Sequence, residues 1–246
     1  MYLVSIRRQG LSGQDLQSIR RFFLGKHVLY YKLLNPFPEV SFLSGIDSGF
    51  FALNIALNYR HLKFRQPGGT IHNLQGKNPG GAQPVQRQMI KQGGLILGAG
   101  NTDDFWMPEQ LKTVAEQQGY YRNEIVKGIT FDNLRQIIKQ DHTALVAFDV
   151  DTQGNPGCYG GANAHWAVVV GYGVYHDGDI YVVATHSWGN FYTWKLETLV
   201  QSNSQLLHLP QSLQQQAVAN GQQTTSPAAS SIKLNAVRNT MFVPIF

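Results

Sequence analysis

The chain has 246 residues, of which 43% are hydrophobic and 11% aromatic, so it can bury one substantial core, and we expect a single domain over residues 1–246. The 20 Lys and Arg outnumber the 15 Asp and Glu, but they are scattered along the chain, which indicates a solvated surface rather than a nucleic-acid site. A single cysteine excludes an internal disulfide framework and a cysteine-based zinc site, and no apolar run approaches the ~20 residues needed to cross a bilayer.

The first half of the chain carries the helical patterns. Residues 13–24 predict a short amphipathic helix that precedes a breaker at Asn35–Pro38. A second helix is expected to begin at Asp47 or Ser48, because both residue types favour helix starts and apolar residues follow at helical spacing. Two more amphipathic helices are predicted, one opened by Pro108 and ending near Gln118, and one over about 130–140.

The second half changes to strand patterns. Strands are predicted over residues 144–148, 165–172, 180–185 and 191–194, with a hairpin turn at Asp177-Gly178 and a final strand over 240–245. Helices ahead of an antiparallel sheet predict an α+β domain in which N-terminal helices pack on the sheet.

Two long segments have the composition of loops. Residues 67–101 are rich in Gly, Pro, Gln and Asn, and we expect this insertion to border a cleft and restrict how much substrate can enter. Residues 208–231 are rich in Gln, Ser and Ala, which predicts a mobile excursion.

The residues that could take part in catalysis lie at one helix start and one strand start. A thiol hydrolase needs a nucleophile of lowered pKa, a histidine within hydrogen-bond reach and donors for the oxyanion. A helix start favours negative charge through its free N–H groups and dipole, and Ser48 lies at such a start. Because alternation directs His165 to the same face as Ala167, we expect its imidazole to lie near the Ser48 hydroxyl.

Three segments carry a resemblance to a known family: Asp47-Ser48-Gly49, His165-Trp166-Ala167-Val168-Val169 and Ser187-Trp188-Gly189. They resemble the papain-like cysteine peptidases, including the bacterial peptidases that trim double-glycine leaders. Over residues 40–246 the chain is more similar to the actin maturation proteases, through a polar loop after a strand ending in Asp149 or Asp151, a Gly-rich turn with Cys158, and the segments 192–194 and 199–203.

The resemblance implies a papain-like fold and a cysteine-type peptidase that removes an N-terminal residue or short peptide from a protein, with an actin-like protein as one candidate. It implies no metal and no cofactor. Ser48 takes the nucleophile position and His165 that of the general base. His186 is the first candidate for the residue that orients His165, because it precedes Ser187-Trp188-Gly189 where the family carries Asn, and Asn190 is the second.

An orienting His186 would have to be neutral and accept the proton of the His165 ring. Its ordinary pKa then predicts that a restored enzyme loses activity on the acid side near pH ~6 to 7.

Serine at position 48 has three interpretations: an engineered replacement of cysteine that inactivates the enzyme, a natural pseudoenzyme, or a serine nucleophile. A serine-hydrolase elbow is not formed, because Ile46 and Phe50 occupy the positions that need glycine. Cys158 is a rival nucleophile, but it lies in a loop without a helix to lower its pKa, and we interpret it as non-catalytic.

Two other functions keep the same scaffold. One is a catalytically dead module that binds a peptide or a host protein, and the other is a transglutaminase-like enzyme that transfers the acyl group to an amine. The expected partner is a protein or peptide substrate, with no nucleic acid and no membrane, and His72, His142, His176 and His208 lack metal-ligand spacing. We expect the protein to act in the cytosol, or in a host cytosol if it is a secreted bacterial effector.

Overall fold

The computed structural model describes residues 14–24, 27–35, 48–64, 107–117, 120–188, 190–207 and 236–245. The predicted loop over 67–101 and the predicted excursion over 208–231 lie outside the described residues. Within the described part, no helix is long and apolar enough to cross a membrane.

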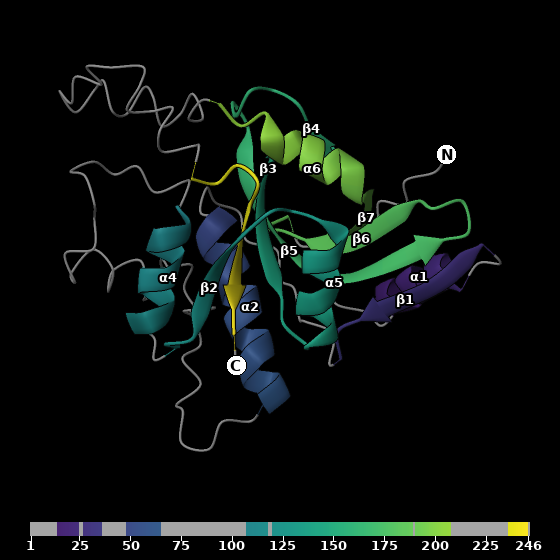
Figure 1. Ribbon diagram of the computed structural model, residues 1–246, viewed down its shortest axis with the longest axis horizontal. Helices are drawn as coiled ribbons and strands as arrows, with labels where there is room; N and C mark the ends of the chain where they lie inside the picture. Colours follow the sequence, from purple (N-terminus) through teal and green to yellow (C-terminus); the bar gives the residue numbers. More distant parts are fainter. Residues whose placement is uncertain are drawn as a thin grey trace.

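An antiparallel sheet of eight strands forms the centre of the described structure (Figure 1). The main path of neighbouring strands is β2-β8-β3-β5-β6-β7, while β1 also pairs with β5 and β4 with β3. The strands are β1 (Val28–Leu33), β2 (Asn123–Lys127), β3 (Ala144–Val150), β4 (Pro156–Gly157), β5 (Ala164–Tyr175), β6 (Ile180–Thr185), β7 (Phe191–Lys195) and β8 (Thr240–Pro244).

Strand β5 is the longest and has neighbours on both edges. Its first half pairs with β3, its second half pairs with β1, and its other edge pairs with β6. Residues 166–173 of β5 are all buried, as expected for a strand covered on both faces. Glycine at position 171 lets β1 pair closely, because a Cβ there would approach the main-chain oxygen of Lys32 to 2.8 Å.

Helices cover both faces of this sheet. They are α1 (Gln14–Phe23), α2 (Ser48–Phe64), α4 (Pro108–Gln117), α5 (Phe131–Lys139) and α6 (Leu196–Ser204). Phe131 of α5 packs on Tyr172 with ring centroids 5.4 Å apart, whereas Phe23 of α1 packs against the next residue, Gly173. Since successive strand residues face opposite sides, α1 and α5 lie on opposite faces. In Figure 1, α2 lies behind the sheet, and α5 and α6 lie in front of it.

Helix α2 is the central helix. It packs against β3, β5, β8 and α4, and its residues 51–53, 55–57 and 59 are nearly inaccessible to solvent. A helix that is apolar on most of its circumference is stable only when other elements surround it, which explains why α2 is buried.

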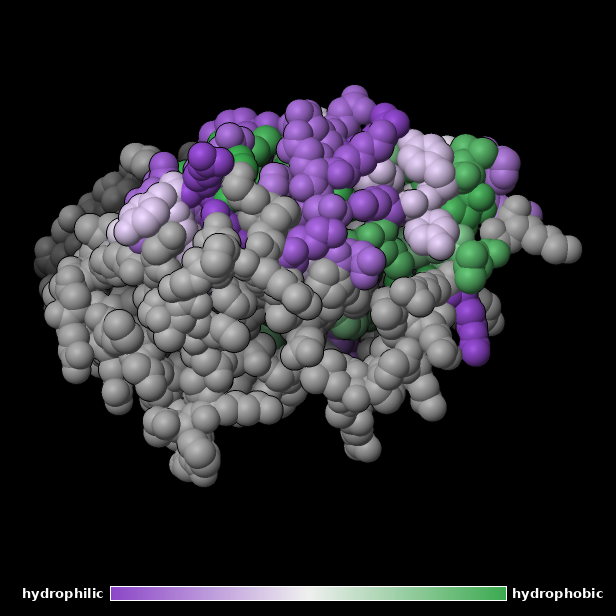
Figure 2. All heavy atoms as spheres, turned by 90° about the horizontal axis from the view of Figure 1, so that it is seen from below, coloured by the Kyte–Doolittle hydropathy of each residue, from purple (hydrophilic) through white to green (hydrophobic). Residues whose placement is uncertain are grey.

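The outer end of the molecule carries exposed apolar residues. Figure 2 shows them gathered where α1 and β1 lie. They include Leu24, Leu29, Tyr30 and Tyr31, with exposed fractions from 40% to 68%.

The predicted α+β class with an antiparallel sheet is confirmed, and so is the helix that begins at Ser48. The prediction that the helices precede the sheet is wrong in detail, because β1 and β2 lie between helices in the chain and still join the sheet. Strands β1, β2 and β4 and helix α6 are not among the predicted elements.

Candidate active site

Ser48 is the first residue of α2 and is 1% exposed. Its Oγ accepts a hydrogen bond of 3.2 Å from the main-chain N–H of Trp166, 118 positions away. The fold therefore joins the start of α2 to the strand end that carries His165. The polar contact of the Ser48 hydroxyl is with the N–H of Trp166 and that of the His165 ring is with Ser187, and the two side chains are not hydrogen-bonded to each other.

His165 is the second residue of β5, and its Nε2 lies 3.0 Å from the Oγ of Ser187. Aromatic rings surround the imidazole, with the centroid of Phe148 at 5.9 Å, that of His186 at 5.0 Å and that of Trp188 at 6.1 Å. Burial, together with the nearby His186, lowers the pKa of His165 well below the ordinary 6.5. The imidazole is therefore neutral near pH 7 and can accept a proton.

His186 follows β6 and has no solvent exposure. Its Nε2 lies 3.1 Å from the carbonyl oxygen of Gly154, so Nε2 carries the ring proton and its N–H donates a hydrogen bond to that oxygen. Nδ1 is then the unprotonated nitrogen, and it has no hydrogen-bond partner. The prediction that His186 accepts the ring proton of His165 is therefore wrong, since the two rings meet edge to face at 89° without a hydrogen bond.

Burial also changes the acid-base behaviour of His186. Burial lowers the pKa of His186 to about 4, although the hydrogen bond to Gly154 acts in the opposite direction and raises it. The expected acid limb near pH 6 to 7 rested on the ordinary pKa of a solvated histidine, and this burial removes its basis.

Asn190 lies between β6 and β7. Its side-chain amide donates to the hydroxyl of Tyr192 at 3.1 Å, and its carbonyl accepts from Thr185 Oγ1 at 2.8 Å. The ring of Tyr192 in turn stacks on His186, with centroids 4.7 Å apart. The structure therefore joins Asn190 to the site through Tyr192 and His186.

A buried carboxylate holds the loop that leads into β5. Asp149 is inaccessible to solvent, and its two oxygens accept bonds from the backbone N–H groups of Tyr159, Gly161 and Asn163 at 2.8 to 3.0 Å. The amide of Gln205 donates a fourth bond at 2.6 Å. In the sequence, the signal for this role of Asp149 is a carboxylate followed by a Gly-rich turn, and the family resemblance alone pointed to Asp149 or Asp151.

Cys158 belongs to this same loop, directly after β4, and its side chain is exposed. The loop around it is fixed by Asp149 rather than by a helix start. The structure therefore gives Cys158 none of the surroundings of Ser48, in line with its interpretation as a loop cysteine.

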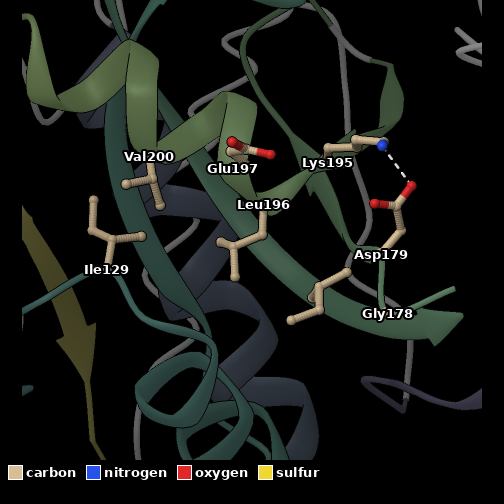
Figure 3. A pocket seen from close by; sticks show the side chains of 8 residues that line it. Ile129, Gly178, Asp179, Lys195, Leu196, Glu197 and Val200 are labelled. Carbon is tan, nitrogen blue, oxygen red and sulfur yellow. Dashed lines mark ion pairs between the residues drawn. The ribbon is translucent and has the colours of Figure 1, made fainter.

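A groove of about 310 Å³ lies between the start of β6 and the start of α6, and none of the predicted site residues lines it. Figure 3 shows Ile129, Leu196 and Val200 on its apolar side and the ion pair of Lys195 with Asp179, 2.5 Å long, at its rim.

Comparisons with known proteins match part of this chain. Residues 97–173 match the family described as actin maturation protease-like, C-terminal domain. This segment extends from before α4 through most of β5, so it includes Asp149 and His165 and leaves out Ser48, His186 and Ser187.

The actin maturation protease of Drosophila melanogaster is 37% identical to this chain over 79 residues. The aligned part is 32% of this chain and 30% of that protein, so the chain matches less than a third of the relative's length. Together the two matches support a relationship to actin maturation proteases.

Proposed function

We propose that the chain has the scaffold of a papain-like cysteine peptidase acting at the N-terminal end of a protein, with position 48 as the nucleophile position and His165 as the general base. One observation carries the proposal: the hydroxyl at the start of α2 is bonded to the backbone N–H that follows His165. A helix start, a buried neutral imidazole and a nearby N–H donor are the parts that a thiol nucleophile requires.

The chemistry follows from these parts when residue 48 is cysteine. His165 accepts the thiol proton, and the sulfur bonds to the carbonyl carbon of the scissile peptide. The imidazolium returns the proton to the leaving amine as the C–N bond breaks, and water then hydrolyses the thioester. The start of α2 and the N–H of Trp166 favour the negative charge on the sulfur.

Serine at position 48 is expected to make this reaction far slower. A thiol can be held as thiolate beside an imidazolium, whereas a hydroxyl remains protonated at neutral pH. Hydrolysis should therefore rise at least ~100-fold in a Ser48→Cys variant, the size expected when acid-base catalysis becomes effective.

The substrate proposal rests on the relatives. Because the similar proteins are named for actin maturation, the test substrates are an N-terminal actin peptide and intact actin, and mass spectrometry measures the loss of N-terminal residues. Cleavage by Ser48→Cys, but not by Ser48→Cys with His165→Ala, is the expected result. A Ser48→Cys protein that folds and leaves both substrates intact would contradict the proposal.

Serine itself favours a second candidate, a peptide-binding module without catalysis. In this case the chain with Ser48 binds the same actin peptide, and Ser48→Cys leaves its affinity unchanged without cleavage. Titration of both proteins with the labelled peptide distinguishes the two functions.

A further inference from the structure

The most direct polar contact of the His165 ring is with Ser187. His165 belongs to β5 and Ser187 to the turn after β6, and their Nε2 and Oγ atoms are 3.0 Å apart. Ser187 is 2% exposed and lies in the turn after β6, next to His186. Such a contact fixes both the ring orientation of His165 and the nitrogen that remains for chemistry.

The two residues expected to orient His165 have other partners. His186 donates from Nε2 to Gly154, and its Nδ1 has no hydrogen-bond partner. The Asn190 amide donates to Tyr192. Ser187 is thus the residue whose polar atom meets the His165 ring.

We infer that Ser187 is the positioning residue of the site: its Oγ accepts the Nε2–H of His165 and leaves Nδ1 as the unprotonated nitrogen that exchanges a proton with residue 48. This inference rests on the proposed function. The tautomer follows from the chemistry, because a ring nitrogen can act as base only if the proton resides on the other nitrogen. When His165 becomes imidazolium, Nε2 still donates to Ser187, so the contact persists through the proton transfer.

A nucleophilic role for Ser187 fits the structure less well. Its hydroxyl lies in a turn, without the helix start that Ser48 has. A substrate carbonyl would have to enter the space now filled by the rings of His165 and Trp188, whose centroids are 6.1 Å apart. Positioning requires no such access.

The test is ¹⁵N NMR of the histidine rings in the full chain as it stands, compared with Ser187→Ala, Ser187→Thr and the exposed-serine control Ser204→Ala. We expect His165 to be the Nε2–H tautomer with slow exchange of that proton. Ser187→Ala should lose the slow exchange and populate both tautomers, while Ser187→Thr, which keeps the hydroxyl, and Ser204→Ala should match the parent. An unchanged His165 spectrum in Ser187→Ala would overturn the inference.

The Ser48→Cys background supplies a kinetic readout. There Ser187→Ala should lower kcat on the order of 10-fold with little change in KM, and Ser187→Thr should restore it. Labelling of Ser187 by a fluorophosphonate would show a nucleophile and contradict a positioning role. The NMR result does not depend on hydrolysis, so an inert Ser48→Cys protein with the expected tautomer contradicts only the proposed function.

Discussion

The two histidines of the site are both held neutral by burial, but they have different partners. His165 meets the hydroxyl of Ser187, and His186 meets the carbonyl of Gly154. A buried histidine costs stability in acid, because the unfolded chain binds a proton that the folded chain does not. For His186 this window extends from the ordinary pKa of 6.5 down to about 4.

The free energy of unfolding should therefore fall as the pH drops through this window, and His186 accounts for about 3 kcal/mol of the loss. The sign follows from the lowered pKa: above pH 6.5 both states are neutral, and below it only the unfolded state is protonated. His186→Gln removes this titration and keeps an amide that can donate to Gly154. Urea unfolding between pH 7 and 4 should show a smaller loss for His186→Gln.

The exposed His176 provides the control, and His176→Gln should follow the parent. Equal losses in the parent and in His186→Gln would show that His186 is not protonated differently in the two states.

The positions of Ser48 and His165 could be predicted because both depend on local patterns, a helix start and the first residues of an apolar strand. The partner of His165 could not. His186 and Ser187 are neighbours that directly follow β6. The direction of each side chain depends on the loop that supplies Gly154. Sequence spacing does not encode that direction.

At the scale of elements, the loop between β3 and β5 controls the site. Asp149 holds its second half, and Gly154 in its first half meets both His186 and Tyr192. Gly154 has a φ of +87°, and a Cβ at this position would collide with the Tyr192 ring. The loop can thus approach the rings only with glycine at position 154.

Gly154→Ala should destabilise the fold by about 2–4 kcal/mol, from backbone strain and from displacement of Tyr192. Gly178 is a matched control, because its φ is +85° and a Cβ there meets nothing within 4 Å. Gly178→Ala should destabilise the fold through backbone strain alone, by about 1 kcal/mol. Chemical denaturation measures both, and equal losses would mean that the contact with Tyr192 does not limit the loop.

Helix signals explain which elements were predictable. Helix α5 begins after Thr130, whose side chain accepts a hydrogen bond from the N–H of Asn133, and it was predicted. Helix α6 begins after Lys195, which provides no side-chain cap, and it directly follows β7. Nothing local marks that boundary, so α6 was missed.

For the molecule as a whole, the sheet brings together residues that are far apart in the chain. Ser48 and Trp166 meet because α2 packs on β5, while β6 places Ser187 beside His165. The α+β class could be predicted from the change of periodicity, whereas the places of β1 and β2 in the sheet could not. A short strand of mixed exposure has no clear pattern in the sequence, and its place in the sheet depends on pairing with a distant strand. Strand β2, for example, pairs with β8.

The measurement that tests the paired roles of residue 48 and His165 most directly is the rate of alkylation of a Ser48→Cys protein by iodoacetamide from pH 5 to 9, read at each thiol by mass spectrometry. Cys158, exposed in its loop, is the internal reference. We expect the thiol introduced at position 48 to react faster than Cys158 and to stay reactive below pH 7, and the further change His165→Ala to abolish this. A thiol at position 48 that titrates near ~8.5 with or without His165, as an ordinary cysteine does, would contradict the pairing.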